Sequence, residues 1–251
     1  MRLTSNLAAW AAALCTALLV AASSAQAANI QSVDVLRYTA PDGETYFALP
    51  LSAPAAGAQQ ALVPRDIVIL FDTSASQTGS HRVQALAVLD DVLGSLDRSD
   101  RVHLFAVDVQ ATSLSRDWVT VGSDALSEAV AKLKRRAPLG ATRLGPALAS
   151  AARVLADKRP GSVLFIGDGM SSAQLVGADE LKQTLARFRN RHIPIHSYGV
   201  GPRLDLQVLG VMAQQTGGTV LVDRGRKTET DIGSRLAQAI HARVSYPVKV
   251  S

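Results

Sequence analysis

The sequence predicts an α/β fold in which a doubly wound, mostly parallel central sheet carries helices on both faces. From Asp66 onward, short apolar runs alternate with amphipathic segments, which is the order of elements in such sheets. Most runs lack the polar alternation of a strand with one wet face, as expected for strands buried on both sides. The predicted strands lie at residues 67–71, 102–107, 163–166, 195–200 and 219–222.

Six segments have the periodicity of amphipathic helices. In the first, apolar residues recur at spacings of three and four, at Val83, Leu86, Leu89, Val92, Leu93 and Leu96. The other helices are expected at residues 124–136, 145–157, 178–191, 204–215 and 231–243. Residues 117–120 are a candidate edge strand.

The N-terminus has the features of an export signal. Arg2 precedes an apolar stretch over residues 7–22, and Ala25-Gln26-Ala27 has the small-x-small pattern of a signal peptidase site. We therefore expect residues 1–27 to be a signal peptide cleaved after Ala27, and the protein to be secreted or periplasmic in the cell envelope. Because a membrane span needs roughly 20 apolar residues, a retained anchor is the lesser alternative, and no stable span is expected after cleavage.

The rest of the chain divides into three predicted parts. Residues 28–64 contain a β-hairpin over 33–51, with Pro41-Asp42-Gly43-Glu44 at its turn, and a linker rich in Ala, Pro, Gly and Gln. Residues 65–243 form the α/β domain. Residues 244–251 are a strand-like tail that stops abruptly, which suggests the front end or a fragment of a longer architecture. We expect this tail to pair with the hairpin in a small satellite sheet.

Composition predicts a folded domain with an aliphatic core, since 47% of residues are hydrophobic, 19% are charged and only 4% are aromatic. The net charge is +5 and the pI about 9.7. The basic residues are spread out, with clusters at 132–136, 187–191 and 224–227 that are typical of solvated helix faces and loops. No nucleic-acid partner is therefore expected.

Polar side chains follow the first predicted strand. Asp72 comes directly after five apolar residues, and Ser74 and Ser76 follow at alternate positions, so an extended loop would point all three side chains the same way. In an open α/β sheet, functional residues gather beyond the carboxyl ends of the strands. Three different roles for Asp72 fit the sequence less well. Thr78 or Ser80 is better placed as a helix cap, a haloacid-dehalogenase-type nucleophile would need Asp in place of Ser74, and no glycine-rich dinucleotide loop follows.

Two later segments point to the same edge of the sheet. Thr142 lies in a loop before a helix, and Asp168 follows the strand that ends in Ile166-Gly167. Taken alone, Thr142 is more often a helix cap than a ligand, and Asp168 is equally well explained as a turn residue.

Together these residues resemble the metal-ion-dependent adhesion site of von Willebrand factor type A domains, which integrin inserted domains share. That site has Asp-x-Ser-x-Ser after the first strand, Thr in a later loop and Asp after the fourth strand. The matching positions here are Asp72, Ser74, Ser76, Thr142 and Asp168. Gly145-Pro146-Ala147-Leu148 also resembles the family's Gly-x-Ala-Leu continuation. Gly167 and Ala75 depart from the residues often found there, Thr and Gly, without removing a ligand oxygen.

Two carboxylates and three hydroxyls are hard oxygen donors, which suit Mg²⁺, with Mn²⁺ and Ca²⁺ as alternatives. Zinc is disfavoured, because the only cysteine, Cys15, lies in the signal segment and no histidine has metal-ligand spacing. The resemblance implies a protein-interaction or adhesion domain whose metal binds an Asp or Glu carboxylate of a protein partner. Arg143 and Met170 are expected at the partner-binding rim.

No catalytic set is visible, so the chain is not expected to be an enzyme. A metal-dependent, phosphatase-like hydrolase and a structural envelope module with a stabilising metal site are the alternatives. His103 and His196 fall in predicted strands, where hydrogen-bonded core or edge histidines are expected.

Overall fold

The computed structural model describes residues 36–39, 43–48, 63–155, 159–171, 177–222, 231–244 and 246. The chain divides into two compact units, residues 1–60 and 61–251. The predicted signal peptide and most of the predicted C-terminal tail lie outside the described residues. Among the helices that are described, none combines the length and the apolar character that crossing a membrane requires.

The first unit contains the predicted hairpin. Strand β1 (Leu36–Thr39) pairs antiparallel with β2 (Thr45–Ala48), with Leu36 opposite Ala48 and Thr39 opposite Thr45. Gly43 has a φ of 89°, a left-handed turn conformation that glycine adopts without a steric cost. The Asp-Gly sequence therefore marked this turn correctly.

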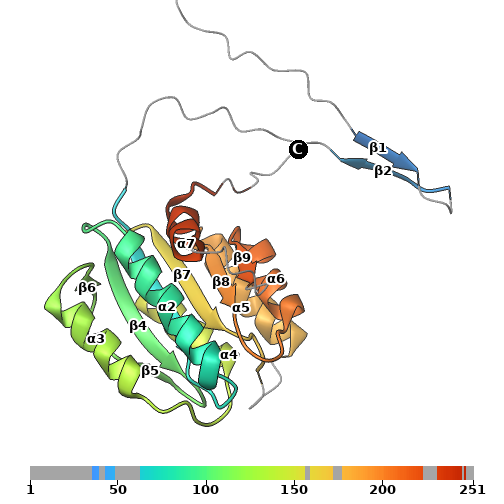
Figure 1. The fold of residues 1–251 in the computed structure, drawn as a ribbon. Helices are drawn as coiled ribbons and strands as arrows, with labels where there is room; N and C mark the ends of the chain where they lie inside the picture. The colour runs from blue at the N-terminus through green and yellow to red at the C-terminus, as the bar shows by residue number, and fades with distance from the viewer. Residues whose placement is uncertain are drawn as a thin grey trace, which may run out of the picture. The chain divides into compact units, whose positions relative to one another are not determined.

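The second unit contains the predicted doubly wound sheet (Figure 1). It has five parallel strands, β3 (Asp66–Asp72), β4 (Arg101–Val107), β7 (Gly161–Gly167), β8 (Ile195–Gly199) and β9 (Val220–Val222). Across the sheet they lie in the order β4, β3, β7, β8, β9. Strands β5 (Ala111–Ser113) and β6 (Val119–Thr120) pair antiparallel with β4. The edge strand expected near residues 117–120 is β6, whereas β5 has only three residues of mixed polarity and no recognisable pattern.

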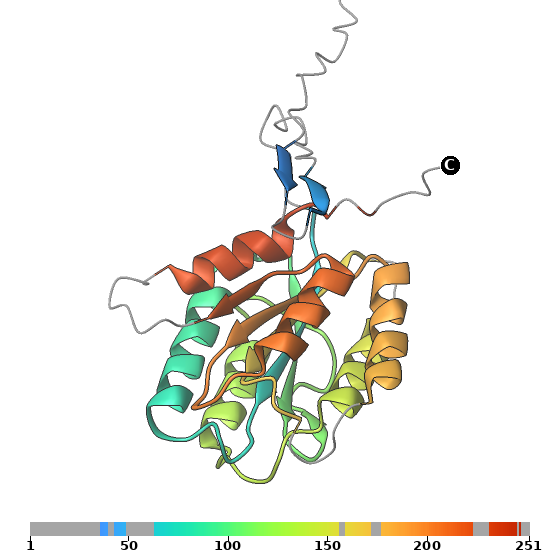
Figure 2. The ribbon, with the colours of Figure 1, turned by 90° about the vertical axis from the view of Figure 1, so that its right-hand side faces the viewer.

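Helices cover both faces of this sheet (Figure 2). One face carries α2 (Gly79–Ser95), α3 (Asp124–Arg135) and α7 (Ile232–His241), and the other carries α4 (Leu144–Val154), α5 (Ala178–Asn190) and α6 (Leu206–Thr216). All six predicted helices are present. Helix α2 begins four residues before Val83, which is 70% exposed and does not belong to the buried face predicted for it.

The two cores explain the unbroken apolar runs in the sequence. Along β3, Ile67, Ile69 and Phe71 pack with α2, α3 and α7, while Val68 and Leu70 pack with α4, α5 and α6. All seven residues of β3 are buried. Apolar side chains are required on both sides of such a strand, so the alternation of a half-exposed strand is absent.

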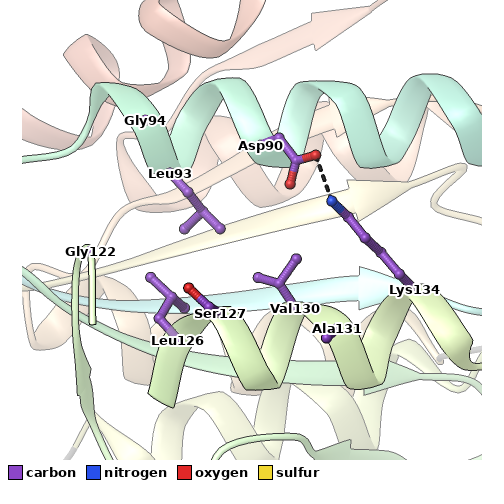
Figure 3. Close-up of a pocket in the computed structure, with 9 residues that line it drawn as sticks. All are labelled: Asp90, Leu93, Gly94, Gly122, Leu126, Ser127, Val130, Ala131 and Lys134. Carbon is purple, nitrogen blue, oxygen red and sulfur yellow. Dashed lines mark hydrogen bonds and ion pairs between the residues drawn. The ribbon is translucent and has the colours of Figure 1, made fainter. Parts of the chain in front are cut away.

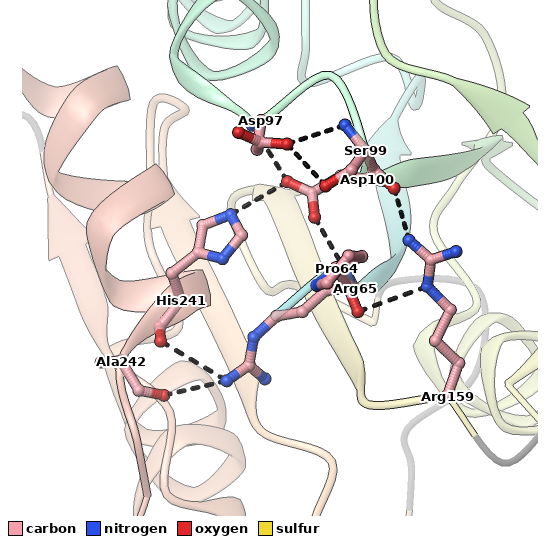
Figure 4. A network of polar contacts seen from close by, with 8 residues as sticks. All are labelled: Pro64, Arg65, Asp97, Ser99, Asp100, Arg159, His241 and Ala242. Atoms are coloured by element: carbon pink, nitrogen blue, oxygen red, sulfur yellow. Dashed lines mark hydrogen bonds and ion pairs between the residues drawn. The ribbon is translucent and has the colours of Figure 1, made fainter. Parts of the chain in front are cut away.

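A polar network holds the amino ends of the central strands (Figure 4). The buried carboxylate of Asp100 accepts hydrogen bonds from the backbone N–H groups of Arg65 at 2.9 Å and Asp97 at 3.0 Å, and His241 Nε2 lies 2.9 Å from it. The Arg65 guanidinium also donates to the carbonyl oxygens of His241 and Ala242, each at 3.4 Å. The network therefore joins the start of β3 to the end of α7.

An apolar groove with a volume of about 410 Å³ lies between α2 and α3 (Figure 3). Leu93, Leu126 and Val130 line it, and the ion pair between Asp90 and Lys134, at 2.8 Å, crosses the space between the helices. None of the five predicted site residues lines this groove.

Candidate metal centre

The strand order places the carboxyl ends of β3 and β7 at a crevice. From β3 the chain passes to β4 on one side and later returns to β7 on the other, so the winding direction reverses between β3 and β7. Ligands of open α/β sheets bind at such a reversal. Asp72 is the last residue of β3 and Asp168 directly follows β7, which puts both carboxylates at this crevice.

Asp72 is completely buried and is held by two groups of the predicted site. Its Oδ1 accepts a hydrogen bond from the backbone N–H of Ser74 at 2.8 Å. The hydroxyl of Thr142 donates to the same carboxylate and lies 3.1 Å from each of its oxygens. Thr142 therefore does not cap a helix, since Arg143 occupies the N-cap position of α4.

Asp168 is joined to the two serines. The Ser76 hydroxyl donates to Asp168 Oδ2 at 2.6 Å, and the Ser74 and Ser76 hydroxyl oxygens lie 3.0 Å apart. The other Asp168 oxygen accepts the backbone N–H of Met170 at 2.9 Å, so Asp168 also serves as a turn residue. All five predicted residues are thus linked in two hydrogen-bonded sets, one around each carboxylate.

Two glycines make room for the carboxylates. A Cβ at Gly167 would lie 2.5 Å from Asp72 Cβ, and a Cβ at Gly201 would lie 2.8 Å from Asp168 Cβ. Contacts this short do not occur between real side chains. Gly167, which stands where family members often have Thr, therefore leaves the space that the Asp72 side chain occupies in this chain.

The loop that carries Thr142 is fastened to the ends of β3 and β4. The backbone N–H of Ala75 donates to Gly140 O at 3.0 Å, and that of Arg143 donates to Asp108 O at 2.9 Å. Asp108, only 8% exposed, forms an ion pair with Arg136 at 2.7 Å. The sequence interpretation missed this pair, although Asp108 follows an apolar run just as Asp72 does.

Gln77 is a second buried group that the sequence interpretation missed. Its Nε2 donates to Val200 O at 2.9 Å, and it lies beside Gly201 and hence near Asp168. Its Oε1 has no hydrogen-bond partner among the described residues. Its position directly after Ser76 is the only signal that could have drawn attention to it.

The electrostatics of the crevice disfavour a charged Asp72 in the absence of a cation. Burial raises the pKa of Asp72 to about 6; hydrogen bonds from Ser74 and Thr142 oppose this rise, and the charge of Asp168 adds to it. Within the described residues, no lysine, arginine or histidine forms an ion pair with Asp72 or Asp168.

The donor set fits a divalent cation of the hard type. Two carboxylates and three hydroxyls converge, and the hydroxyls of Ser76 and Thr142 donate to the carboxylates in the place that cationic side chains often take. The described residues contain no group of three or more His, Cys, Asp or Glu side chains suited to a metal. Any metal here would therefore depend on hydroxyl oxygens, as Mg²⁺ and its relatives allow.

Exposed apolar side chains surround this edge of the sheet. Met170 is 37% exposed, two residues after Asp168, and Leu139 is 67% exposed beside Gly140. Val109 and Leu206 are exposed as well, next to Asp108 and to Asp205, whose backbone N–H donates to Asp168 O at 2.9 Å. Arg143 is half-buried at the start of α4.

Comparison with solved structures gives relatives of the same fold. A von Willebrand factor type A protein from Catenulispora acidiphila matches with a TM-score of 0.60 and 16% identity, over 70% of this chain and 41% of that one. This chain thus spans about two fifths of the length of that protein. The conserved hypothetical protein BatB from Bacteroides thetaiotaomicron matches with a TM-score of 0.55 and 16% identity, over 70% and 96% of the two chains.

A further match is proximal thread matrix protein 1 from the mussel byssus, in a structure with a zinc-occupied MIDAS motif. Its TM-score is 0.54 and its identity 16%, over 70% of this chain and 46% of that one. At such identities, these likenesses establish a shared fold. The sequence model of the von Willebrand factor type A domain family matches residues 65–221, which include the whole crevice. The chain therefore belongs to the von Willebrand factor type A domain family.

Proposed function

We propose that this chain is an exported domain that binds a divalent metal ion and, through it, an acidic group on a protein partner. The observation that carries the proposal is the convergence of Asp72, Ser74, Ser76, Thr142 and Asp168 at the winding reversal of the sheet. Membership of a family of protein-interaction modules supports the same function.

The five side chains would hold the ion, with Mg²⁺ as the expected metal and Mn²⁺ or Ca²⁺ as alternatives. The mussel protein's zinc-occupied motif makes Zn²⁺ a necessary comparison, although the five candidate side chains offer only oxygen donors. When bound, the metal would supply an electrophilic site for a carboxylate oxygen of the partner. Burial of Asp72 supports the proposal, because a buried charge needs a partner charge.

The rim favours a protein over a small molecule as partner. Met170, Leu139, Val109 and Leu206 present exposed apolar surface around the crevice. Such side chains are ordinary at the contact surfaces of proteins, and Met170 is flexible enough to adapt to a partner. Arg143, next to Thr142, would add a charge-assisted contact to the partner's acid.

Metal titration by calorimetry tests the site. The parent protein should bind Mg²⁺ or Mn²⁺, and Asp72→Ala should abolish binding while the circular dichroism spectrum stays unchanged. Asp90→Ala is the matched control, because it removes a carboxylate from the exposed face of α2 and should leave metal binding intact. Metal binding by Asp72→Ala at the parent's affinity would show that the assignment is wrong.

A pull-down with Mg²⁺ or with EDTA, followed by binding of the identified partner, tests the role of the metal. EDTA and Asp72→Ala should each abolish specific capture, and Arg143→Ala should weaken it mildly. Capture that ignores the chelator would remove the metal from the mechanism. Turnover of a generic phosphoester would favour a hydrolase, and a metal effect on thermal stability alone would favour a structural site.

The export part of the proposal is tested separately, because residues 1–27 are not among those the structure describes. N-terminal sequencing of the mature protein should begin at Ala28. Intact Met1 on protein recovered from a soluble cytosolic pool would contradict export.

A further inference from the structure

A second groove lies between α4 and α5, on the face of the sheet that these helices share with α6. Figure 2 shows α4 and α5 side by side. The groove has a volume of about 410 Å³. Among the described residues, two alanines, Ala149 and Ala152, and three arginines, Arg153, Arg187 and Arg191, line it. The small alanine side chains leave space on the α4 side of the groove.

Arg191 is fixed in this groove by the end of α4. Its NH1 donates to Ala152 O at 2.8 Å, and its NH2 donates to Leu155 O. These carbonyls belong to the last turn of the helix and its cap, where cationic groups are favourable. The Arg191 guanidinium is thus held beside Ala152, although the residue as a whole is exposed.

The other two arginines lack such a role. Arg153 and Arg187 are exposed, and neither forms a hydrogen bond or an ion pair with another described residue. No carboxylate occurs among the described residues that line the groove. Three positive charges therefore share one small hollow, and their mutual repulsion would be relieved by a bound anion.

We propose that the groove between α4 and α5 binds a phosphate group through Arg153, Arg187 and Arg191. A single carboxylate carries one charge and holds its two oxygens in one plane, so it matches guanidinium groups from two helices less well than a phosphate does. A phosphate group presents oxygens in several directions and can accept from guanidinium groups on both helices. The shared chemistry is the phosphate oxyanion, whether it belongs to a free phosphate or to a lipid headgroup.

This site is separate from the candidate metal centre. Helix α4 begins next to Thr142, and Arg153 lies nine residues after Leu144, about 14 Å along the helix axis. Binding in the groove therefore needs no metal and is expected to survive EDTA. A failure of metal binding at Asp72 would leave this proposal standing, and the reverse also holds.

The test is calorimetric titration of the full chain with inorganic phosphate, at low salt and in EDTA. Arg153→Ala and Arg187→Ala should each weaken binding about tenfold, since each removes a charge-assisted hydrogen bond. Arg189→Ala is the matched control: it removes the same charge from the same helix, but Arg189 contacts Gln215 of α6, 3.3 Å away, rather than the groove. It should change the affinity less than about twofold, within the spread of a long-range charge effect.

Sedimentation with phosphatidylglycerol or phosphatidylcholine vesicles distinguishes the two sources of phosphate. Binding to vesicles that is lost in Arg153→Ala and Arg187→Ala, and kept in Arg189→Ala, would assign the groove to a lipid headgroup. Equal losses in all three variants would show that only net charge matters and would overturn the proposal. So would the absence of binding to both inorganic phosphate and the vesicles, because the three arginines would then have no phosphate ligand.

Discussion

Asp72 is a buried carboxylate whose described partners are hydroxyl and N–H groups. Its ionised form therefore lowers the free energy of unfolding of the metal-free protein. Because burial raises its pKa to about 6, the folded protein holds the proton more tightly than the unfolded chain does. The cost of ionising Asp72 is fully present at neutral pH and is relieved as the pH falls through about 6.

Asp72→Asn should therefore stabilise the metal-free protein at neutral pH by about 1–3 kcal/mol, while it removes metal binding. Urea unfolding in EDTA measures this. Asp90→Asn, at an exposed position, should leave the unfolding midpoint nearly unchanged. A lower midpoint for Asp72→Asn would mean that the ionised carboxylate is stabilised by groups other than a metal.

The two strand histidines differ at the residue scale. His103 Nε2 lies 2.8 Å from the Ser113 hydroxyl, as expected of a hydrogen-bonded strand histidine. His196 is 1% exposed, and neither of its ring nitrogens has a partner among the described residues, so the expectation of a hydrogen bond was wrong there. Burial, with the charge of Arg65, lowers the pKa of His196 to about 4.

His196 should make the fold sensitive to acid. The unfolded chain takes up a proton on this side chain near pH 6.5 and the folded protein only near 4, so stability is lost as the pH falls between these values. Relative to neutral pH, the free energy of unfolding should be lower by about 2 kcal/mol at about pH 5. Urea unfolding of the parent and of His196→Leu should be measured from about pH 4 to 7, and the change in the free energy of unfolding with pH compared between them. Identical slopes would show that His196 does not titrate differently in the two states.

At the scale of elements, the ion pair between Arg136 and Asp108 ties the loop after α3 to the end of β4. Arg136 is the C-cap of α3, and the backbone carbonyl of Asp108 accepts the N–H of Arg143, directly after Thr142. This connection places the Thr142 hydroxyl against Asp72 although the two residues are 70 positions apart.

Arg136→Ala should cost about 1–2 kcal/mol, because it leaves the mostly buried Asp108 carboxylate without its charged partner. The loosened loop should also weaken Mg²⁺ binding severalfold. Lys134→Ala is the control, since Lys134 lies on the helix that Arg136 caps, α3, and forms only an exposed ion pair with Asp90 of α2. Urea unfolding and metal titration measure both effects, and equal losses in the two variants would exclude a positioning role for Arg136.

At the scale of the α/β domain, the carboxyl and amino ends of the parallel strands carry different groups of polar residues. The carboxyl edge holds the candidate metal centre, and the amino edge holds the network around Asp100 in Figure 4, which connects the entry to β3 with the end of α7. A partner bound at the carboxyl ends of the strands would therefore not contact the network around Asp100 at their amino ends.

Asp100→Ala should destabilise the domain by about 3 kcal/mol, since it leaves the N–H groups of Arg65 and Asp97 and the ring of His241 without their buried acceptor. Asp97→Ala, which removes a solvent-accessible carboxylate from the same turn, should have a small effect. Chemical denaturation compares the two variants. An unchanged midpoint for Asp100→Ala would show that water replaces the network at no cost.

Much of the fold follows from local pattern. Apolar runs and helical periodicity predicted the five parallel strands and six helices, since burial on one or two faces leaves a period in the sequence. The helix α2 boundary, the exposure of Val83 and strand β5 were not predicted, because short or half-exposed segments leave little periodicity.

The sequence by itself determined the family resemblance and the chemistry of the five candidate ligands, because strand-end carboxylates and hydroxyls are conspicuous after apolar runs. Only the tertiary structure decided that Thr142 serves Asp72 rather than capping α4, that Gly167 makes room for Asp72, and that Asp108 and Arg136 hold the loop between them. It also brought Arg153 and Arg191 to one groove. The physical reason is that distances between residues far apart in the chain are set by strand order and helix packing, which leave no trace in a local pattern.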